Sequence, residues 1–509
     1  MMLYDVTGLL DRAAGAHPDR IALADDKKEL SYREYREKAM AIAAGIEARA
    51  PGERRKAVAV LIDRNVESII CFLGAAYSGN YYVPVDMSLP EERISLIYER
   101  TSPLLIIDAR NKKNDVPGAV SFETIVSENR GKAYEPSVNI DTDPLYAIFT
   151  SGSTGIPKGV LISHRSVLDM VQAFEEAFHF EEGTVFANQA PFDFDVSVKD
   201  IYNSLYVGGR VEVLPKKLFK MPKLLTEHLR ERKADTIIWA VSALRIVADF
   251  KTFDVNEPPQ LKNVMFSGET MPGRVLAYWR EHIPEARYVN LYGPTEITCN
   301  CTYHEIKEAP DPAQAIPIGK PFVNSRVFLR DEEGRRVSEK NVIGEICIAG
   351  SCLALGYIND SSMTERAFIQ DPLAGGYRSE VYVSGDLGYY NDRGELVFAG
   401  RRDSQIKHMG HRIELGELEL VLNSVGGIDT GCCLYDASKE AIVCFYQSAE
   451  PRRKEILEAF AKKLPKYMRP TEYVRYRAIP MNKNAKIDRA LLKQMIKEGN
   501  YGSADKDNE

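Results

Sequence analysis

The chain has 509 residues, of which 44% are hydrophobic and 27% charged, and its net charge is −7 with histidine neutral. This is ordinary globular composition in a chain too long for a single hydrophobic core, so at least two domains are expected. Mild acidity argues against a nucleic-acid-binding surface over the whole molecule, and the lack of a long apolar run argues against a membrane helix. The eight cysteines include no C-x-x-C pair, which argues against a disulfide or zinc framework. The first residues also lack a secretory signal, so a reduced, cytoplasmic protein is expected.

Strand-like and helix-like segments alternate through the first three hundred residues. Residues 57–62 are apolar and β-branched, 66–77 have helical spacing, and 81–85 are strand-like again, which predicts a β-α-β unit. The same alternation recurs further along the chain, where strand-like runs at 236–241, 264–266 and 288–291 accompany a helix-like run at 244–250. Strands that alternate with helices indicate parallel sheets covered by helices, and therefore an α/β body.

The pattern changes after about residue 318. Short strand-like runs separated by turn signals predict an antiparallel, barrel-like β region at 326–329, 345–349, 382–383 and 396–399. A smaller α+β segment follows, with helical stretches at 415–422 and 453–464 and strands at 432–434 and 442–446. We therefore predict a core at 1–402, a second domain at 403–499 and a disordered polar tail at 500–509.

The second predicted domain is basic. Residues 403–499 contain 17 Lys and Arg against 13 Asp and Glu, although the whole chain is acidic. Two interpretations remain open: a solvated helical face, or a docking surface for an acidic partner.

A loop rich in glycine and hydroxyl side chains follows one apolar run. Residues 146–160 read YAIFTSGSTGIPKGV, a composition suited to binding phosphate through backbone N–H groups, hydroxyls and a lysine. The loop is not a Walker A motif, because Pro157 stands where its second glycine belongs and Gly159 where its Ser or Thr belongs. A flexible Ser/Gly surface loop is the alternative.

This loop resembles the signature of the adenylate-forming (ANL) superfamily, which includes acyl-CoA synthetases, luciferases and the amino-acid adenylation domains of nonribosomal peptide synthesis. Further segments match motifs of that superfamily in its order: 79–86, 290–296, 382–386, 400–419 and 484–489. The resemblance covers essentially residues 8–497. It implies a two-part fold with a mobile C-terminal domain.

The resemblance also implies an activity. Members activate a carboxylate with ATP and Mg²⁺ as an acyl-adenylate, release pyrophosphate, and pass the acyl group to a thiol. By resemblance, Lys486, Glu296 and Thr150 are catalytic, and Glu296 is the metal ligand. The implied ATP-binding residues are Thr150, Ser151, Gly152, Ser153, Thr154, Gly155, Lys158, Gly268, Glu269, Asn290, Leu291, Tyr292, Gly293, Thr295, Asp386, Arg401 and Lys486.

Residues 192–200, which read FDFDVSVKD, resemble the substrate element of amino-acid activators. A carboxylate at Asp195 suits an α-ammonium group, because a buried carboxylate needs a cation; a turn cap is the alternative. The implied pocket comprises Phe194, Asp195, Val196, Lys199, Trp239, Met265, Ser267, Leu291, Cys299 and Asn300. Bulky Trp239 and Met265 favour a small amino acid, serine or alanine of either chirality, with glycine and cysteine as the alternatives. Lys199 either points out of this pocket or binds an acidic side chain.

The sequence between 192 and 202 also resembles the D-alanine–carrier-protein ligases, which are free-standing enzymes. Because the chain ends soon after Lys486, we expect the acceptor to be a separate acidic carrier protein with a phosphopantetheine thiol, met by the basic second domain. Coenzyme A is the competing acceptor, and an acyl- or aryl-CoA synthetase is the alternative function. The resemblance makes Asp403 the hinge about which the second domain rotates.

Overall fold

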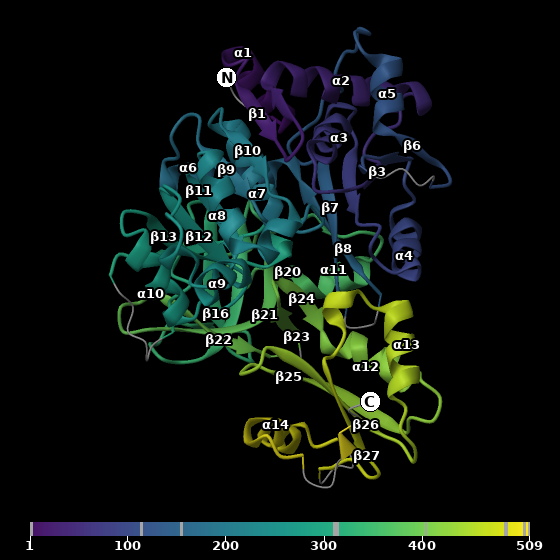
Figure 1. Ribbon diagram of the computed structural model, residues 1–509, viewed down its shortest axis with the longest axis vertical. Coiled ribbons are helices and arrows are strands. Elements are labelled where there is room, and N and C mark those ends of the chain that lie inside the picture. Colours follow the sequence, from purple (N-terminus) through teal and green to yellow (C-terminus); the bar gives the residue numbers. More distant parts are fainter. Residues whose placement is uncertain are drawn as a thin grey trace. The chain divides into compact units, whose positions relative to one another are not determined.

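The computed structural model describes residues 4–111, 116–152, 156–308, 315–402, 405–482, 487–501 and 505–506. The chain divides into two compact units, the first made of Met1–Asp86, Thr101–Ile148 and Gly159–Arg402, and the second of Met87–Arg100, Phe149–Lys158 and Asp403–Glu509. Figure 1 follows the chain from purple to yellow. The second unit differs from the predicted 403–499 domain because it includes 87–100 and 149–158. The functional division of the chain stays a prediction.

One sheet contains seven strands: β3 (Ala57–Leu61), β4 (Tyr81–Val85), β5 (Leu105–Asp108), β6 (Ala119–Ser121), β7 (Pro144–Thr150), β8 (Lys158–Ser163) and β19 (Gly356–Tyr357). Their order is β19-β8-β7-β4-β3-β5-β6. Neighbouring strands from β7 to β6 in this order pair in parallel, whereas β19 is antiparallel to β8. Every residue of β3 and β4 is buried, which explains their continuous apolar sequences.

A second sheet contains nine strands: β1 (Ile21–Ala24), β2 (Glu29–Ser31), β9 (Val185–Asn188), β10 (Arg210–Val213), β11 (Thr236–Ala240), β12 (Asn263–Ser267), β13 (Arg287–Tyr292), β14 (Thr302–Glu305) and β15 (Lys320–Pro321). The order is β15-β14-β13-β12-β11-β9-β10-β1-β2. Strands β13 to β1 of this order pair in parallel, and the strands at the two edges are antiparallel.

Helices of the first unit are α1 (Thr7–Ala16), α2 (Tyr32–Arg49), α3 (Val66–Tyr77), α5 (Phe122–Asn129), α6 (His164–Phe178), α7 (Val196–Tyr206), α8 (Pro222–Glu231), α9 (Val241–Asp249), α10 (Gly273–His282) and α11 (Ser361–Ala367), with 3-10 turns η1 (Lys216–Lys220), η2 (Thr252–Asp254) and η3 (Thr295–Ile297). All residues of α3 are buried, and the Asn65 side chain caps its first turn by accepting from the Ser68 N–H. Most of its residues are apolar, and Glu67, the charged residue among them, pairs with Lys28, so the helix suits a core position.

The third sheet of the first unit is antiparallel throughout. It contains β16 (Ser325–Arg330), β17 (Arg336–Val337), β18 (Gly344–Gly350), β20 (Phe368–Gln370), β21 (Glu380–Tyr390) and β22 (Leu396–Arg401). The path is β17-β16-β18-β21-β20, and β22 pairs with β21. Two sheets with parallel interiors and one antiparallel sheet confirm the predicted α/β fold class.

The second unit contains the helices and strands α4 (Glu91–Thr101), β23 (Gln405–His408), β24 (His411–Glu414), α12 (Leu415–Asn423), β25 (Thr430–Asp436), β26 (Ala441–Gln447), α13 (Arg453–Lys463), η4 (Lys466–Met468), β27 (Glu472–Tyr476), α14 (Arg489–Glu498) and β28 (Asp505–Lys506). Strands β23 and β24 form a hairpin, and the others form a sheet in the order β25-β26-β27-β28. This mixture of helices and strands confirms the predicted α+β character of the C-terminal part.

Part of the predicted tail is ordered. Tyr501 is only 5% exposed, its ring lies 5.8 Å from that of Phe445, and its carbonyl oxygen accepts from the Tyr476 hydroxyl at 3.0 Å. Strand β28 then pairs with β27. The prediction that 500–509 is disordered is therefore wrong for these residues, because one aromatic ring in the polar tail completes a hydrophobic cluster.

All eight cysteines lie in the described part of the chain, where they are buried free thiols. The two that form a cross-strand pair, Cys433 and Cys444, lie inside the sheet of the second unit. Within the described ranges, no helix combines the length and the apolar character needed to cross a bilayer.

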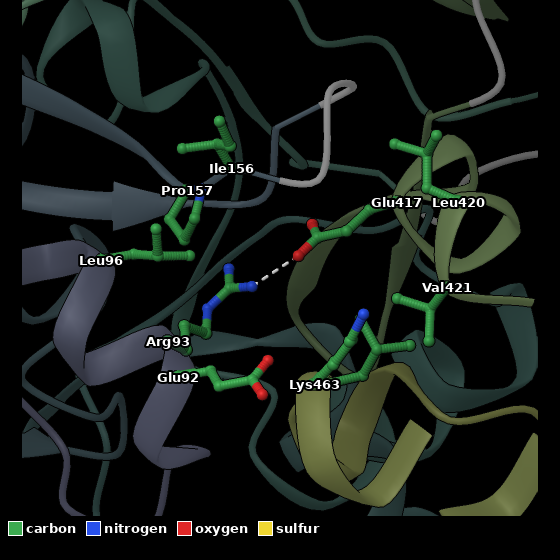
Figure 2. A pocket seen from close by; sticks show the side chains of 10 residues that line it. Glu92, Arg93, Leu96, Ile156, Pro157, Glu417, Leu420, Val421 and Lys463 are labelled. Atoms are coloured by element: carbon green, nitrogen blue, oxygen red, sulfur yellow. Dashed lines mark hydrogen bonds and ion pairs between the residues drawn. The ribbon is translucent and has the colours of Figure 1, made fainter. Parts of the chain in front are cut away.

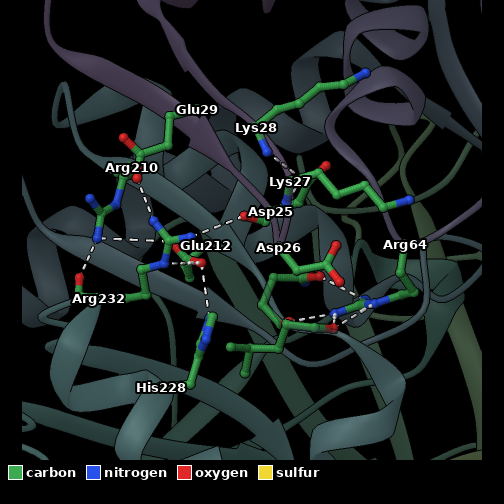
Figure 3. A network of polar contacts seen from close by, with 12 residues as sticks. Asp25, Asp26, Lys27, Lys28, Glu29, Arg64, Arg210, Glu212, His228 and Arg232 are labelled. Carbon is green, nitrogen blue, oxygen red and sulfur yellow. Dashed lines mark hydrogen bonds and ion pairs between the residues drawn. The ribbon is translucent and has the colours of Figure 1, made fainter.

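A buried ionic cluster ties β10 to α8 and to the first hairpin (Figure 3). Glu212 is fully buried, and its Oε1 atom lies 3.1 Å from His228 Nε2 and 3.3 Å from Arg232 Nε. Arg232 also pairs with Glu29 of β2. Because a buried carboxylate is stable only when its charge is compensated, this cluster depends on Glu212.

Changing Glu212→Gln is expected to lower the free energy of unfolding by about 3 kcal/mol, because it removes the buried carboxylate that the half-buried Arg232 and Arg210 guanidinium groups share. Urea-induced unfolding followed by circular dichroism measures the loss. Glu182→Gln is the matched control: Glu182 is 64% exposed and pairs with Arg20 at 2.8 Å, so the expected loss is much smaller. Equal losses in the two variants would contradict this interpretation of the cluster.

Candidate active site

The predicted site residues of the first unit gather where parallel strands of the nine-stranded sheet end. Ser267 is the last residue of β12, and Tyr292 is the last residue of β13. The carboxyl ends of neighbouring parallel strands share one edge, where α/β sheets bind their ligands. A polar cavity of about 480 Å³ lies instead at the amino ends of these strands, beside Lys262 and Arg287, and contains none of the predicted residues.

Asp386 connects two other residues of the predicted nucleotide site. Its side chain is buried on β21, Tyr292 Oη donates to its Oδ2 atom at 2.5 Å, and Arg401 of β22 donates to Oδ1. Burial, with the nearby Asp386 carboxylate, raises the pKa of Tyr292 well above its ordinary value, so the phenol remains a donor. The residues predicted to bind adenine and ribose thus form one hydrogen-bonded group.

The turns around this group need glycine at two positions. A Cβ atom on Gly293 would lie 2.6 Å from the Asn300 Cα atom, so only glycine permits this close approach. Gly268 has φ +96°, which favours glycine directly after β12, and Glu269 follows it half-buried. The other predicted residues here, Asn290, Leu291 and Thr295, are buried, and the Asn290 amide donates to the Pro317 carbonyl at 2.8 Å.

Glu296, the predicted metal ligand, is fully buried in η3. The Tyr357 hydroxyl donates to Glu296 Oε1 at 2.7 Å. Tyr357 was not predicted from the sequence, because it lies 61 residues further along the chain in a strand of two residues, and no spacing relates it to Glu296.

Lys199 points into the predicted substrate pocket. Its Nζ atom donates to Asn300 Oδ1 at 2.9 Å and to Ser267 Oγ at 3.3 Å, and the side chain is fully buried. Burial lowers the pKa of Lys199 from its ordinary value, and the nearby Cys299, Asp195 and Asp200 act in the opposite direction. The structure therefore brings three predicted pocket residues together and disagrees with the interpretation that Lys199 points away.

The backbone beside Lys199 is strained. Thr298 and Cys299 have φ +57° and +76°, values that cost non-glycine residues about 1–3 kcal/mol each. Thr298 Oγ1 donates to the Cys352 carbonyl at 2.9 Å, and Cys299 Sγ donates to the Asp195 carbonyl at 2.9 Å. These bonds hold the unusual turn that places Asn300 beside Lys199.

Asp195 begins α7 and is half-buried, as are its neighbours Phe194 and Val196. Its side chain makes no capping hydrogen bond to the helix, and its backbone is already helical, with φ −60° and ψ −26°. The carboxylate therefore makes no cap for α7 itself. Its role in binding an α-ammonium stays a prediction.

Trp239 corrects one predicted pocket position. Side chains alternate across the sheet, so Ile238 and Met265 belong to one hydrophobic cluster and Trp239 to the cluster on the other face, where its Nε1 atom donates to the Ala187 carbonyl. The register pairs Ser267 with Ala240, which is therefore the β11 residue next to the pocket. The size argument for a small substrate consequently rests on Met265 without Trp239.

The phosphate loop belongs to the second unit. Ser151 Oγ donates to the Arg412 carbonyl at 2.7 Å and accepts from the Glu414 N–H at 3.2 Å, and Lys158 Nζ lies 4.0 Å from Glu414 Oε1. A Cβ atom on Gly152 would lie 2.1 Å from the Ile156 carbonyl oxygen, which explains the glycine there. The loop therefore contacts β24, within the predicted hinge block.

Five predicted residues lie outside the described part of the chain: the loop residues Ser153, Thr154 and Gly155, the hinge residue Asp403 and the catalytic Lys486. Their roles stay predictions.

A cavity of about 220 Å³ lies within the second unit, between α4, the end of the phosphate loop, α12 and α13. In Figure 2, Arg93 Nη1 points to Glu417 Oε1, and the two atoms are 2.6 Å apart. Lys463 lies across the cavity from Arg93, on the same side as Glu417. Both members of the pair are buried, and burial raises the pKa of Glu417. The cavity contains no residue predicted to bind substrate or nucleotide.

The residues present fit ATP and Mg²⁺. The buried Thr150 hydroxyl has no hydrogen-bond partner among the described residues, as expected of a phosphate-loop donor. No group of three or more His, Cys, Asp or Glu side chains in the described ranges is arranged to hold a metal ion. A site with Glu296 as its carboxylate suits Mg²⁺, which takes few protein ligands and completes its shell with water and substrate phosphates.

Comparisons with known proteins agree with these motifs. Residues 10–358 match the family model described as "AMP-binding enzyme". The D-alanine–D-alanyl carrier protein ligase of Bacillus anthracis is 32% identical over 493 residues, which cover 93% of this chain and 96% of the ligase. Bacitracin synthase 1 of Bacillus licheniformis is 32% identical over 491 residues, and this chain spans only 9% of its length. The structure of holo-PA1221, an NRPS protein containing adenylation and PCP domains, superposes with a TM-score of 0.85 at 26% identity, covering 96% of this chain and 84% of that one.

Proposed function

The chain belongs to the AMP-binding enzyme family, and we propose that it activates a small amino acid with ATP and transfers the aminoacyl group to a separate carrier protein. In the first step the amino-acid carboxylate attacks the α-phosphorus, which forms the aminoacyl-adenylate and releases pyrophosphate. In the second step a phosphopantetheine thiol attacks the aminoacyl carbon, which forms a thioester and releases AMP. The place of Asp195 carries the amino-acid assignment: it lies directly before α7, and the Cys299 Sγ–Asp195 carbonyl bond of 2.9 Å joins it to the turn beside Lys199.

In this proposal the first step is governed by charge, because a carboxylate must approach an anionic phosphate. Thr150, Ser151 and Lys158 bind the terminal phosphates, and Lys486 neutralises the charge between the carboxylate and the α-phosphate. Glu296 would hold Mg²⁺, which would supply further charge neutralisation on the phosphate oxygens. Asp386 accepts hydrogen bonds from the ribose hydroxyls, with Arg401 beside it, while Tyr292 contacts the adenine.

In this proposal the Asp195 carboxylate binds the α-ammonium of the substrate. The side chain of the substrate lies in a space lined by Met265, Ser267, Asn300 and Lys199. Serine or alanine, of either chirality, suits this set. The buried Lys199 ammonium favours one further candidate, an amino acid with an acidic side chain, because its two hydrogen-bond acceptors are neutral.

A carrier protein is the proposed acceptor. The Bacillus anthracis relative, of which this chain covers 96%, is named as a D-alanine–D-alanyl carrier protein ligase. The basic residues that we predict to meet this carrier are Lys462, Lys463, Lys466, Arg469, Arg475 and Arg477. Lys462, Lys463, Lys466 and Arg477 are exposed, although Lys462 also pairs with Glu92 at 3.0 Å. Arg475 is buried and Arg469 donates to the Leu464 carbonyl, so these two contribute less to the surface. Coenzyme A remains the competing acceptor, and an acyl- or aryl-CoA synthetase the alternative function.

ATP–pyrophosphate exchange tests the proposal. The purified chain is incubated with labelled pyrophosphate, ATP, Mg²⁺ and each common amino acid in both chiralities, with benzoate and octanoate as representative aryl and acyl acids. We expect exchange with serine or alanine above all other acids. Exchange with aspartate would select the acidic candidate, exchange only with an aryl or acyl acid would select the alternative function, and no exchange with any acid would contradict adenylation.

A further inference from the structure

Glu296 is held from two directions by one segment, which we term the 352–358 strap. The Ala354 N–H donates to the Glu296 carbonyl oxygen at 2.9 Å, and the Tyr357 hydroxyl donates to Glu296 Oε1 at 2.7 Å. The two side chains are buried, with 0% and 7% exposure. Backbone and carboxylate of the predicted metal ligand are therefore fixed by the same strap.

The strap is anchored to the strand that follows the phosphate loop. Its residues pair antiparallel with β8, with Tyr357 opposite Val160. The Leu355 N–H donates to the Leu161 carbonyl at 2.8 Å, and the Ile358 N–H donates to the Gly159 carbonyl at 2.9 Å. Glu296 is thereby linked through the strap to Gly159, the last glycine of the phosphate-loop motif.

Tyr357 itself has little freedom. Its backbone N–H donates to Thr364 Oγ1 at 3.0 Å, and its ring packs edge-on against Phe368 at 6.0 Å between centroids. The preceding Gly356 has φ +120°, and a Cβ atom there would lie 2.6 Å from Thr364 Cγ2, so the strap approaches α11 as closely as glycine allows. The phenol therefore reaches Glu296 in one defined orientation.

We propose that Tyr357 is a positioning residue for adenylation, which fixes the Glu296 carboxylate by occupying one of its two oxygens. A hydrogen bond from the phenol hydroxyl orients the carboxylate and adds no opposing charge to it, as outer-shell partners of metal ligands do. This inference rests on the proposed role of Glu296 in holding Mg²⁺.

The variant Tyr357→Phe removes the hydroxyl and keeps the ring. Manganese binding in the presence of a non-hydrolysable ATP analogue, followed by electron paramagnetic resonance, is expected to weaken by about 10–100-fold. The Mg²⁺ concentration for half-maximal exchange should rise in parallel. Tyr288→Phe is the matched control, because Tyr288 is buried and its hydroxyl donates to the Trp279 carbonyl at 2.7 Å. Neither Tyr288 nor Trp279 is a predicted site residue. The metal affinity of this control should equal that of the unchanged chain.

Two further variants separate the inference from the function beneath it. If Tyr357 acts through Glu296, Tyr357→Phe should add little to the loss caused by Glu296→Gln in a double-mutant cycle. If Glu296→Gln weakens manganese binding but Tyr357→Phe behaves like Tyr288→Phe, the positioning role is overturned and the proposed function stands. If Glu296→Gln leaves manganese binding unchanged, the proposed metal ligand is wrong, and the role of Tyr357 falls with it.

Discussion

Replacing Asp195 with alanine is expected to lower kcat/KM for amino-acid-dependent ATP–pyrophosphate exchange by about 10²–10⁴-fold. The variant removes the carboxylate that we propose to pair with the α-ammonium, and loss of one partner from a desolvated ion pair costs about 3–5 kcal/mol. An acyl- or aryl-CoA synthetase has no ammonium to bind, so the same change would leave its exchange reaction almost intact. Initial rates at varied amino-acid concentration, with ATP saturating, give the ratio.

Asp193→Asn is the control for Asp195→Ala. Asp193 lies two residues earlier, just before α7, and its pKa is raised to about 6, chiefly by burial. An amide at that position keeps the size of the side chain, so we expect exchange within about threefold of the unchanged chain. If both variants lose activity equally, the effect comes from the structure at the start of α7, and the ammonium-binding role of Asp195 is wrong.

Replacing Lys486 with alanine is expected to slow adenylation by about 10²–10³-fold, because the proposed charge between the carboxylate and the α-phosphate disappears from the transition state. The second step should be nearly unaffected. Single-turnover adenylate formation measures the first step, and thioester formation from synthetic aminoacyl-adenylate measures the second.

Lys493→Ala supplies the comparison for the lysine. Lys493 is exposed on α14, in the same C-terminal region, and lies outside every predicted motif. Both of its half-reactions should match those of the unchanged chain. A Lys486→Ala variant that forms adenylate at the normal rate would contradict the proposed chemistry, and one that loses both steps equally would indicate a structural role.

Much of the fold could be predicted from local sequence. The helix at 66–77 and the strand at 81–85 have the predicted bounds, because a continuous apolar stretch ended by capping and turn residues leaves few alternatives. Inclusion of 87–100 in the second unit could not be predicted. It depends on contacts such as the buried Arg93–Glu417 ion pair, which joins residues 324 positions apart.

The site was predicted less completely than the fold. Motifs in chain order identified Asp386, Tyr292 and Arg401, which the structure joins by hydrogen bonds. Trp239 was wrong because successive residues of a strand face opposite sides of the sheet, so an error of one position reverses the assignment. Tyr357 was missed because its contact with Glu296 depends on the strap, for which the sequence offers only an ordinary Gly-Tyr pair.

Oxygen transfer from the amino acid to AMP tests the central claim most directly. The substrate found by exchange is labelled with ¹⁸O in its carboxylate and incubated with the enzyme, ATP, Mg²⁺ and a phosphopantetheine-bearing carrier protein, and the nucleotide products are analysed by mass spectrometry. If the carboxylate attacks the α-phosphorus, each turnover leaves one ¹⁸O atom in AMP. Formation of ADP with the label in inorganic phosphate, or AMP without label, would contradict activation through an adenylate.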